Sequence, residues 1–247
     1  MAVRSIYAER PARGRLRAWS PCLWIRRAPE TEGEVAGAHV VPDGCVDLLW
    51  MRGRLSVAGP DSRHHRVRLE PGERIAGVRL RPGAARPLLG DTPATAVLDT
   101  RVDLHRLWGE AAHRLAERIA GRHDPWEVAE SLASALSARI DRYRPDPVAV
   151  ALAEALNRPR PPTLASAARE LGFSERQLRR RAVAAFGYGP KTLEQILRFR
   201  RVVGACGPET DWGRAAAEQG YTDQAHLSRQ VRRWSGATPS ELAAQAA

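Results

Sequence analysis

The sequence predicts an α+β protein. A β-rich N-terminal domain, either a sandwich or a partial barrel, is followed by two helices and then by an all-α domain of two helix-turn-helix units joined by a central helix. Short apolar runs separated by turn residues occupy residues 1 to about 100, whereas later apolar residues recur every three or four positions. Because 247 residues can bury two cores, we place the domains at residues 1–143 and 144–247.

Strand and turn signals alternate in the N-terminal part. The runs 46–50 and 55–58 flank Arg52-Gly53-Arg54, a sequence suited to a hairpin turn. Two further runs, 67–69 and 75–80, are separated by a Pro-Gly turn. The last run alternates apolar residues with small or charged ones, which is the pattern of a half-buried strand.

Two helices are expected next, over about 102–121 and 124–142. Asp103 can cap the first helix and Gly121 can end it, while Asp124-Pro125 is a favourable start for the second. Each helix carries one apolar face. The pair either covers the sheet or packs against a second copy of the chain, and we favour the first arrangement.

The expected connection between the domains is the segment 142–147. Asp146-Pro147 begins another helix, which extends to about Asn157. The proline-rich segment 158–162 cannot continue that helix, because successive prolines lack amide donors and restrict the residues before them. It leads the chain into the first helix-turn-helix unit.

In the first unit, which begins at Thr163, Gly172 permits a tight turn and Ser174 caps the next helix. Gln177, three residues after the cap, completes a capping-box pattern. The exposed side of this helix is rich in arginine. The N-terminal turn of such a helix can enter the major groove of DNA and read base edges there.

The second unit repeats this pattern around Gly220, with Thr222 or Asp223 as the cap. Arginine can bond guanine, glutamine can bond adenine, and alanine can contact a thymine methyl group. The base-reading candidates of both units are Arg176, Gln177, Arg180, Gln224, Ala225, Ser228 and Arg229. The phosphate-contact candidates are Ser174, Arg179, Arg181, Lys191, Thr222, His226, Arg232 and Arg233, of which His226 has packing as its alternative role.

A longer helix, 190–205, is expected between the two units. At 1.5 Å per residue it spans roughly 24 Å, a suitable length for holding two recognition helices about one DNA turn, roughly 34 Å, apart. Arg198, Arg200 and Arg201 give it a basic side. The formal net charge of the chain, +11, also favours a polyanionic partner, although arginine-rich composition alone can arise without selection for one.

Residues 163–241 resemble the DNA-binding domain of the AraC/XylS family of bacterial transcription regulators. The resemblance implies one domain with two recognition helices in adjacent major grooves on one face of the DNA. One departure is Ala182, where the family usually has a large aromatic residue; Phe186 is expected to fill that space. The matching residues are Ala167-Ala168, Leu171-Gly172-Phe173-Ser174, Arg176, Leu178, Arg180, Phe186-Gly187, Pro190, Gly220-Tyr221, Asp223-Gln224, His226-Leu227, Arg229, Gly236 and Thr238-Pro239.

The N-terminal half resembles the corresponding domain of one subgroup of that family, for which no ligand is assigned. The resemblance rests on the segments 42–50, 58–60, 78–84 and 89–91. It implies a domain that senses a small molecule or mediates dimerisation. The partners implied are double-stranded DNA, a small-molecule effector and RNA polymerase, and the monomer and the homodimer both stay open.

A second class of function stays open beside the regulator: a DNA-directed repair, alkyl-transfer or metal-dependent enzyme that uses the N-terminal half. Cys45 is the candidate alkyl acceptor or redox sensor. The metal-ligand candidates are His39, Asp43, Cys45, Asp47 and His64-His65, but their spacing matches no recognised metal signature. We interpret them as a turn, a buried cysteine and a solvated loop, and expect no metal, cofactor or catalytic residue, since no catalytic motif is present.

Cysteine usage and apolar runs bear on location. The three cysteines, Cys22, Cys45 and Cys206, form no C-x-x-C pair, which favours a reducing compartment. No apolar run approaches the roughly 18 residues of a membrane span, and the first residues contain no apolar export signal. We therefore expect a bacterial cytoplasmic protein, associated with the nucleoid when bound, that does not contact membranes.

Overall fold

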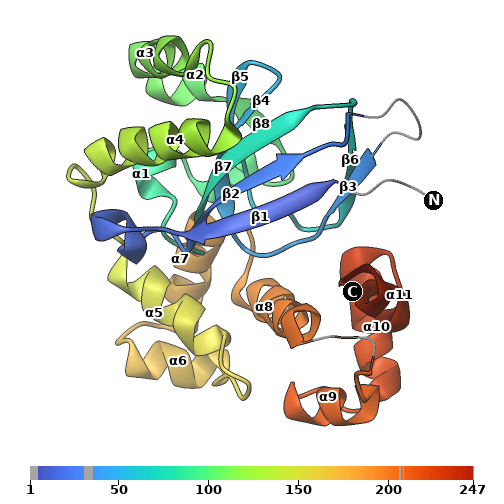
Figure 1. Ribbon diagram of the computed structural model, residues 1–247. Helices are drawn as coiled ribbons and strands as arrows, with labels where there is room; N and C mark the ends of the chain where they lie inside the picture. Colours follow the sequence, from blue (N-terminus) through green and yellow to red (C-terminus); the bar gives the residue numbers. More distant parts are fainter. Residues whose placement is uncertain (1–4, 31–35, 206, 208, 247) are drawn as a thin grey trace.

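The structure, a computed structural model, describes residues 5–30, 36–205, 207 and 209–246 (Figure 1). Its N-terminal part contains two antiparallel sheets. The strands are β1 (Ile6–Pro11), β2 (Cys22–Arg27), β3 (Ala36–Val40), β4 (Val46–Met51), β5 (Arg54–Ala58), β6 (His65–Leu69), β7 (Arg74–Leu80) and β8 (Arg101–Asp103). Six of them form one sheet in the order β1-β2-β7-β4-β5-β8, and β3 pairs with β6 in a second, smaller sheet.

The two faces of the larger sheet bury different side chains, because successive residues of a strand point to opposite sides. On one face, alternate residues such as Leu23, Leu48 and Val78 join the main hydrophobic core beneath the helices. On the other face, Trp24 packs in a separate cluster with Leu69 of the smaller sheet. The second sheet thus lies across the inner face of the first, and this two-sheet unit is called the barrel below.

The N-terminal part also contains helices α1 (Arg86–Leu89), α2 (Leu104–Trp108), α3 (Glu110–Ile119) and α4 (Pro125–Ile140), and the 3-10 turns η1 (Gly14–Ala18) and η2 (Ala94–Val97). Helix α4 packs across β2, β4 and β7 on the outer face of the sheet (Figure 1). This confirms that the helices cover the sheet. Asp124 caps α4 as expected, since its carboxylate accepts a hydrogen bond from the Trp126 amide at 3.1 Å.

The helix expected over about 102–121 is wrong in one respect. The structure breaks it into α2 and α3 at Gly109, whose φ of 53° lies in the left-handed region that interrupts a right-handed helix. Asp103 is the cap of α2, as predicted, but it is also the last residue of β8, a short strand that the sequence did not reveal.

The C-terminal part is all helical, which confirms the α+β class. Its helices are α5 (Pro147–Leu156), α6 (Leu164–Glu170), α7 (Glu175–Phe186), α8 (Pro190–Ala205), α9 (Trp212–Glu218), α10 (Gln224–Ser235) and α11 (Pro239–Ala246). They share a second core, which includes Leu152, Leu178, Ile196 and Trp234. Ala182 and Phe186 are both fully buried in it.

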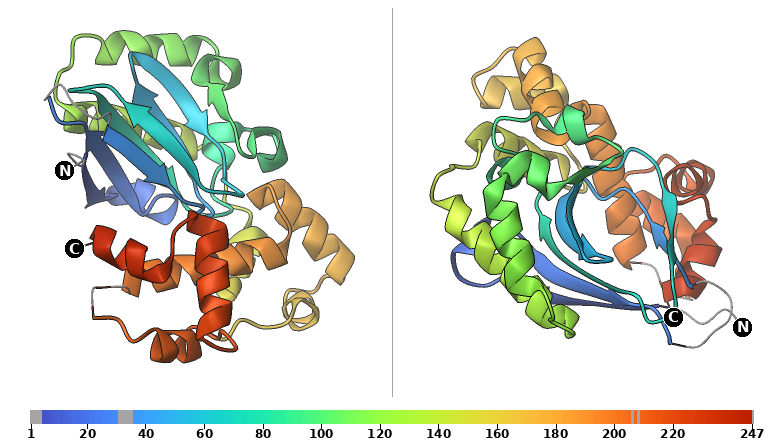
Figure 2. Two further views of the ribbon diagram at one scale, coloured as in Figure 1. Left: turned by 90° about the vertical axis from the view of Figure 1, so that its right-hand side faces the viewer. Right: turned by 90° about the horizontal axis from the view of Figure 1, so that it is seen from above.

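The helical part packs directly against one end of the barrel (Figure 2). Val41 and Leu98, from the N-terminal half, are half-buried against the helical core. At the end of α7, Gly187 has a φ of 83°, and a Cβ atom there would lie 3.0 Å from Pro60 Cγ and 3.3 Å from the carbonyl oxygen of Ala94. Glycine is therefore required at this contact both for its backbone conformation and for its size.

Among the described residues, no helix combines the length and the apolar character that a membrane crossing requires.

Candidate nucleic-acid interface and adjoining cavity

The first recognition helix, α7, begins with the predicted capping box. The Ser174 Oγ accepts a hydrogen bond from the Gln177 amide at 3.3 Å, and Gln177 Oε1 accepts one from the Ser174 amide at 2.9 Å. Two otherwise free amides at the helix start are thereby satisfied. The capping box also occupies the side-chain oxygen of Gln177, Oε1. Gln177 must therefore break this capping bond before its side-chain amide can form two hydrogen bonds with a base.

The basic residues of α7 fall into two groups. Arg176, Arg179 and Arg180 are exposed. Arg181 is held against the protein: its guanidinium forms an ion pair with Asp146 at 3.1 Å and lies 4.8 Å from the ring centroid of Phe173. The first group is free to reach DNA, whereas Arg181 links α7 to the start of α5.

The second recognition helix, α10, is capped by Asp223 and not by Thr222. Its carboxylate accepts a hydrogen bond from the His226 amide at 2.6 Å. The His226 ring packs edge-on against buried Tyr221, with 5.3 Å between ring centroids, which agrees with a packing role. Thr222 is exposed beside the cap.

The outward residues of α10 differ in exposure. Gln224, Ala225 and Arg229 are exposed, while Ser228 is half-buried. Further along α10, Arg232 and Arg233 are exposed too, and the Arg233 guanidinium lies 4.8 Å from the Trp234 ring. All of these belong to one helix whose opposite side is anchored in the core by Leu227, Val231 and Trp234.

The arginines expected to give α8 a basic side mostly bind other parts of the protein. Arg198 forms an ion pair with nearly buried Glu194 and donates to the carbonyl oxygen of Gly220 at 3.1 Å. Arg201 donates to Gln219 Oε1 at 2.9 Å and to the carbonyl oxygen of Asn157 at 2.8 Å. The side chains of Arg198 and Arg201 therefore tie α8 to the ends of α5 and α9.

Lys191, a phosphate candidate at the start of α8, also has a partner, since its ammonium lies 2.9 Å from Glu194 Oε2. The lysine side chain is 71% exposed, so DNA phosphate can compete for it.

Helix α8 also contacts the barrel. Arg200 donates a hydrogen bond to the carbonyl oxygen of Asp43 at 3.2 Å. Phe199, Arg200, Val203 and Gly204 form one wall of a cavity of about 1010 Å³ that extends between the two sheets. The helix that joins the recognition units is thus part of the wall of the barrel's cavity.

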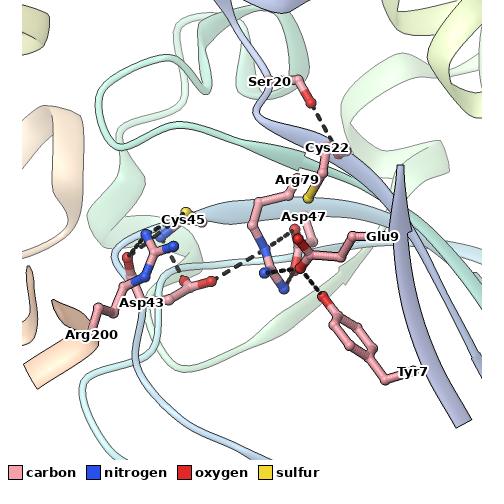
Figure 3. Close-up of polar contacts among 9 residues, drawn as sticks. All are labelled: Tyr7, Glu9, Ser20, Cys22, Asp43, Cys45, Asp47, Arg79 and Arg200. Atoms are coloured by element: carbon pink, nitrogen blue, oxygen red, sulfur yellow. Dashed lines mark hydrogen bonds and ion pairs between the residues drawn. The ribbon is translucent and has the colours of Figure 1, made fainter. Parts of the chain in front are cut away.

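The inner wall of this cavity carries a cluster of charges centred on Arg79 (Figure 3). The guanidinium lies 3.2 Å from Asp43 Oδ2, 3.3 Å from Asp47 Oδ1 and 3.4 Å from Glu9 Oε1. Burial alone would lower the pKa of Arg79, but Asp47 and Asp43 raise it well above its usual value. Burial raises the pKa of Asp47 even though Arg79 opposes the shift. Charge is therefore concentrated on a face that is otherwise apolar.

The residues considered for metal binding or reactive chemistry have other roles. Asp43 and Asp47 bind Arg79, and the two imidazoles of His39 and His64 contact each other at 3.3 Å. In the part of the chain that the structure describes, no three His, Cys, Asp or Glu side chains converge on a common metal position. His64, expected in a solvated loop, is instead half-buried.

Neither described cysteine has the environment of a reactive thiol. Burial raises the pKa of Cys45 well above its usual value, and a reactive cysteine requires the opposite shift. Burial also raises the pKa of Cys22 to about 12. The third cysteine considered, Cys206, lies outside the described residues.

Most of the cavity could not be predicted from the sequence. Glu9 and Arg79 lie on strands whose inner positions should be apolar in a sheet covered on both faces. The signal was present in β7, where Arg79 interrupts the apolar run, but its partner across the sheet, Asp47, depends on the register. The pairing of distant strands cannot be read from one sequence.

Comparisons with known proteins agree with this division of the chain. Residues 8–103 match the family model described as a domain of unknown function (DUF6597), and residues 167–245 match the model described as a helix-turn-helix domain. No curated protein sequence matches the chain significantly.

Several solved structures are similar to the chain. ToxT from Vibrio cholerae O395 aligns at 10% identity over 89% of this chain and 95% of that chain, with a TM-score of 0.48. The same protein bound to (E)-4-(8-methylnaphthalen-1-yl)but-3-enoic acid aligns at 10% identity over 99% of both chains, with a TM-score of 0.49. The regulator CdpR from Pseudomonas aeruginosa aligns at 18% identity over 70% of this chain and 46% of that chain, with a TM-score of 0.32. These similarities are remote.

Two capped, arginine-bearing recognition helices joined by one central helix define a DNA-binding protein of the double helix-turn-helix class. Residues 167–245 match an AraC-type helix-turn-helix domain, so the C-terminal part of the chain is a DNA-binding domain of that type.

Proposed function

We propose that the protein is a transcription regulator that reads two adjacent major-groove segments of a specific DNA site, and that a small molecule in the barrel's cavity modulates this binding. The observation that carries the proposal is the double role of α8. This helix joins the two recognition units, and Phe199, Arg200, Val203 and Gly204 on it line the cavity. A ligand in the cavity would therefore contact α8, the helix that sets the distance and orientation between the two recognition helices, α7 and α10.

Base reading is assigned to the exposed N-terminal turns of α7 and α10. Arg176 and Arg180 supply guanine-reading guanidinium groups on α7, and Arg229 supplies one on α10. Gln224 and Ala225 complete the second unit, with Ser228 contributing less because it is half-buried. Gln177 is kept as a reader only if DNA binding displaces its capping bond.

Phosphate contacts fix the position of such a protein on the duplex without specifying sequence. The side chains that suit this role best are exposed and basic: Arg179, Arg232 and Arg233. Ser174, Arg181, Lys191, Thr222 and His226 stay in the proposal as weaker candidates, since most of them already have partners within the protein.

The test of DNA reading is selection of bound duplexes from random DNA, followed by footprinting of the selected site. We expect protection of two segments, about one helical turn apart, on one face of the duplex. Arg180→Ala should relax the preference in one segment and Arg229→Ala in the other. Arg114→Ala is the matched control, because Arg114 is an exposed arginine of α3 on the N-terminal half. Selection of no common sequence would contradict the proposal.

The other parts of the proposal concern organisation and context. We place the domain boundary between residues 143 and 144, so that residues 1–143 form the sensor or dimerisation domain and 144–247 the reading domain. RNA polymerase is the proposed protein partner of the DNA-bound form, as monomer or homodimer, and the cytoplasm is the proposed location.

A further inference from the structure

The cavity between the sheets is large enough for a small-molecule ligand. Its volume of about 1010 Å³ lies at the upper end of ordinary ligand sites. Its lining is mixed: Tyr7, Trp24 and Phe199 supply aromatic surface, and charged groups occupy the inner wall. The chemistry of those charged groups indicates which class of ligand fits.

Negative charge predominates on the inner wall. Arg79 is one guanidinium among three carboxylates, those of Glu9, Asp43 and Asp47. If all four groups are ionised, the cluster has a net charge of −2 (three negative charges and one positive). One more positive group at this place would be attracted by the carboxylates, of which Asp43 and Asp47 are largely buried and therefore poorly screened by water.

Two further carboxylates extend this acidic region. Asp61 and Asp99 also line the cavity and are half-buried. Burial, together with Asp43 and Asp99, raises the pKa of Asp61 to about 7. Burial is the largest cause of this shift, and the neighbouring carboxylates Asp43, Asp99 and Asp47 add to it.

Most of the arginines that line the cavity are exposed, so water screens their charges more strongly than those of the half-buried Asp43 and Asp47. Arg79 and Arg26 alone are half-buried, and Arg26 is turned toward Ser5 and the Tyr7 ring. Arg52 is 50% exposed and bonds Glu73. The other lining arginines, Arg63, Arg66, Arg68, Arg101 and Arg200, are exposed.

A second observation points to a ligand independently of charge. Trp24 lines the cavity and is only 7% exposed, and its indole Nε1 lies beside the Asp47 carboxylate without forming a hydrogen bond of normal geometry to any described residue. A buried donor of this kind normally has a partner, and leaving one unsatisfied costs about 1–3 kcal/mol. An acceptor atom on a bound molecule would supply it.

We propose that the cavity binds a small organic cation, a primary amine or guanidine on an apolar body, whose charged group is held by Asp43, Asp47 and Glu9. An acceptor atom of the same ligand faces Trp24 Nε1, and its apolar body packs on Tyr7, Trp24 and Phe199. This inference rests on the proposed effector site, of which it names the ligand class.

The test is calorimetric titration of the full chain with 2-phenylethylamine and with 3-phenylpropanoate, which share a ring and chain length but carry opposite charges. Agmatine serves as the guanidine probe. We expect saturable binding of the amine and no saturable binding of the carboxylate. Tighter binding of 3-phenylpropanoate than of 2-phenylethylamine, or no binding of either cation, would overturn the inference.

Substitutions in the cavity test whether the amine binds at the proposed carboxylates. Asp47→Asn and Glu9→Gln should each weaken amine binding at least tenfold, and Asp91→Asn should leave it unchanged because the Asp91 side chain is 93% exposed outside the cavity. Glu9→Gln keeps the test valid if Asp47→Asn does not fold, since Glu9 is 45% exposed. An amine affinity that is the same in both cavity variants as in the natural protein would place the amine elsewhere and refute the assignment.

The proposed hydrogen bond between the ligand and Trp24 Nε1 can be tested separately. Phenylalaninamide adds a carbonyl acceptor to the phenylethylamine skeleton and should bind more tightly than 2-phenylethylamine. Trp24→Phe should remove that difference while preserving the binding of the simple amine. A difference that persists in Trp24→Phe would show that the acceptor binds another donor and would refute this part of the assignment.

These experiments test the inferred ligand class and the proposed regulation of DNA binding separately. Amine binding that leaves the DNA footprint and affinity unchanged would support the ligand class and contradict effector modulation. A two-segment footprint from a protein that binds no amine would support DNA reading and overturn the ligand class.

Discussion

At the scale of single residues, the structure separates side chains that are free to bind DNA from those already committed to the fold. Arg229 is exposed on the first half of α10, whereas Arg181, of the same residue type, is paired with Asp146. Sequence alone could not make this distinction, because both arginines fall on outward helix positions.

The outward position of Arg229 leads to a prediction about specificity. Arg229→Ala should weaken binding to the selected site by about 1–3 kcal/mol more than binding to random DNA, because a bidentate guanine contact is lost. Arg232→Ala, in contrast, should weaken binding to all sequences similarly and reduce the salt slope by about one. Titrations of both DNAs over a range of salt concentrations measure both effects. An equal loss on both DNAs for Arg229→Ala would make Arg229 a phosphate contact.

Asp61 leads to a prediction about pH. Its pKa rises from 3.8 to about 7 in the folded state, so the folded protein holds this proton more tightly than the unfolded chain. The stabilising contribution is therefore complete below about pH 4 and is lost as pH rises through about 7. The groups that set this shift, after burial, are Asp43, Asp99 and Asp47, with Arg101 opposing them, and His65 lies 3.6 Å away.

Asp61→Asn should therefore be more stable than the natural protein at pH 8 and closer to it in stability at pH 4. Urea unfolding at the two pH values measures the difference. A stability gap that is the same at both values would mean that the proton on Asp61 is not linked to folding.

At the scale of helices and strands, local signals predicted best where capping residues mark an end. Asp124, Asp146 and Ser174 each cap the helix that the sequence assigned to them. The break at Gly109 was not predicted because the spacing of apolar residues continues across it. The two helices α2 and α3 therefore have the sequence pattern of one helix. The pairing of β3 with β6, and the cavity between the sheets, depend on contacts between distant segments that no local pattern encodes.

The capping box of α7 leads to a prediction about stability. Ser174→Ala removes the Oγ acceptor of the Gln177 amide and should cost about 1 kcal/mol of unfolding free energy. Ser166→Ala is the control, since Ser166 is exposed within α6 and only its backbone amide takes part in a cap. Denaturant unfolding compares the two; equal stability would show that the box contributes little.

At the scale of the whole molecule, the two halves are packed together and not merely joined by a linker. Gly187 meets Pro60 and Ala94, and Tyr188 is buried close to Gly44. Contacts of this kind require the end of α7 and the start of α8 to keep their places against the barrel. We therefore expect the full chain to unfold in a single cooperative transition.

Two glycines allow this packing to be tested. Gly187 and Gly172 have φ values of 83° and 74°, so alanine is strained at both, but only at Gly187 would the new Cβ meet the N-terminal half. Gly187→Ala should therefore destabilise the protein by more than Gly172→Ala does, by an extra 1 kcal/mol or so. Calorimetric unfolding of both variants gives the comparison. Equal losses would indicate that the two halves do not press on each other here.

The position of α8 in the cavity wall has a consequence for gene regulation. A molecule entering the barrel would act on the spacer between two readers and not on either reader itself. It would then alter which half-site separation fits best, while each half-site kept its own sequence preference. Promoters with slightly different spacing would respond to the same compound in opposite directions, so that one regulator could switch between two sets of genes.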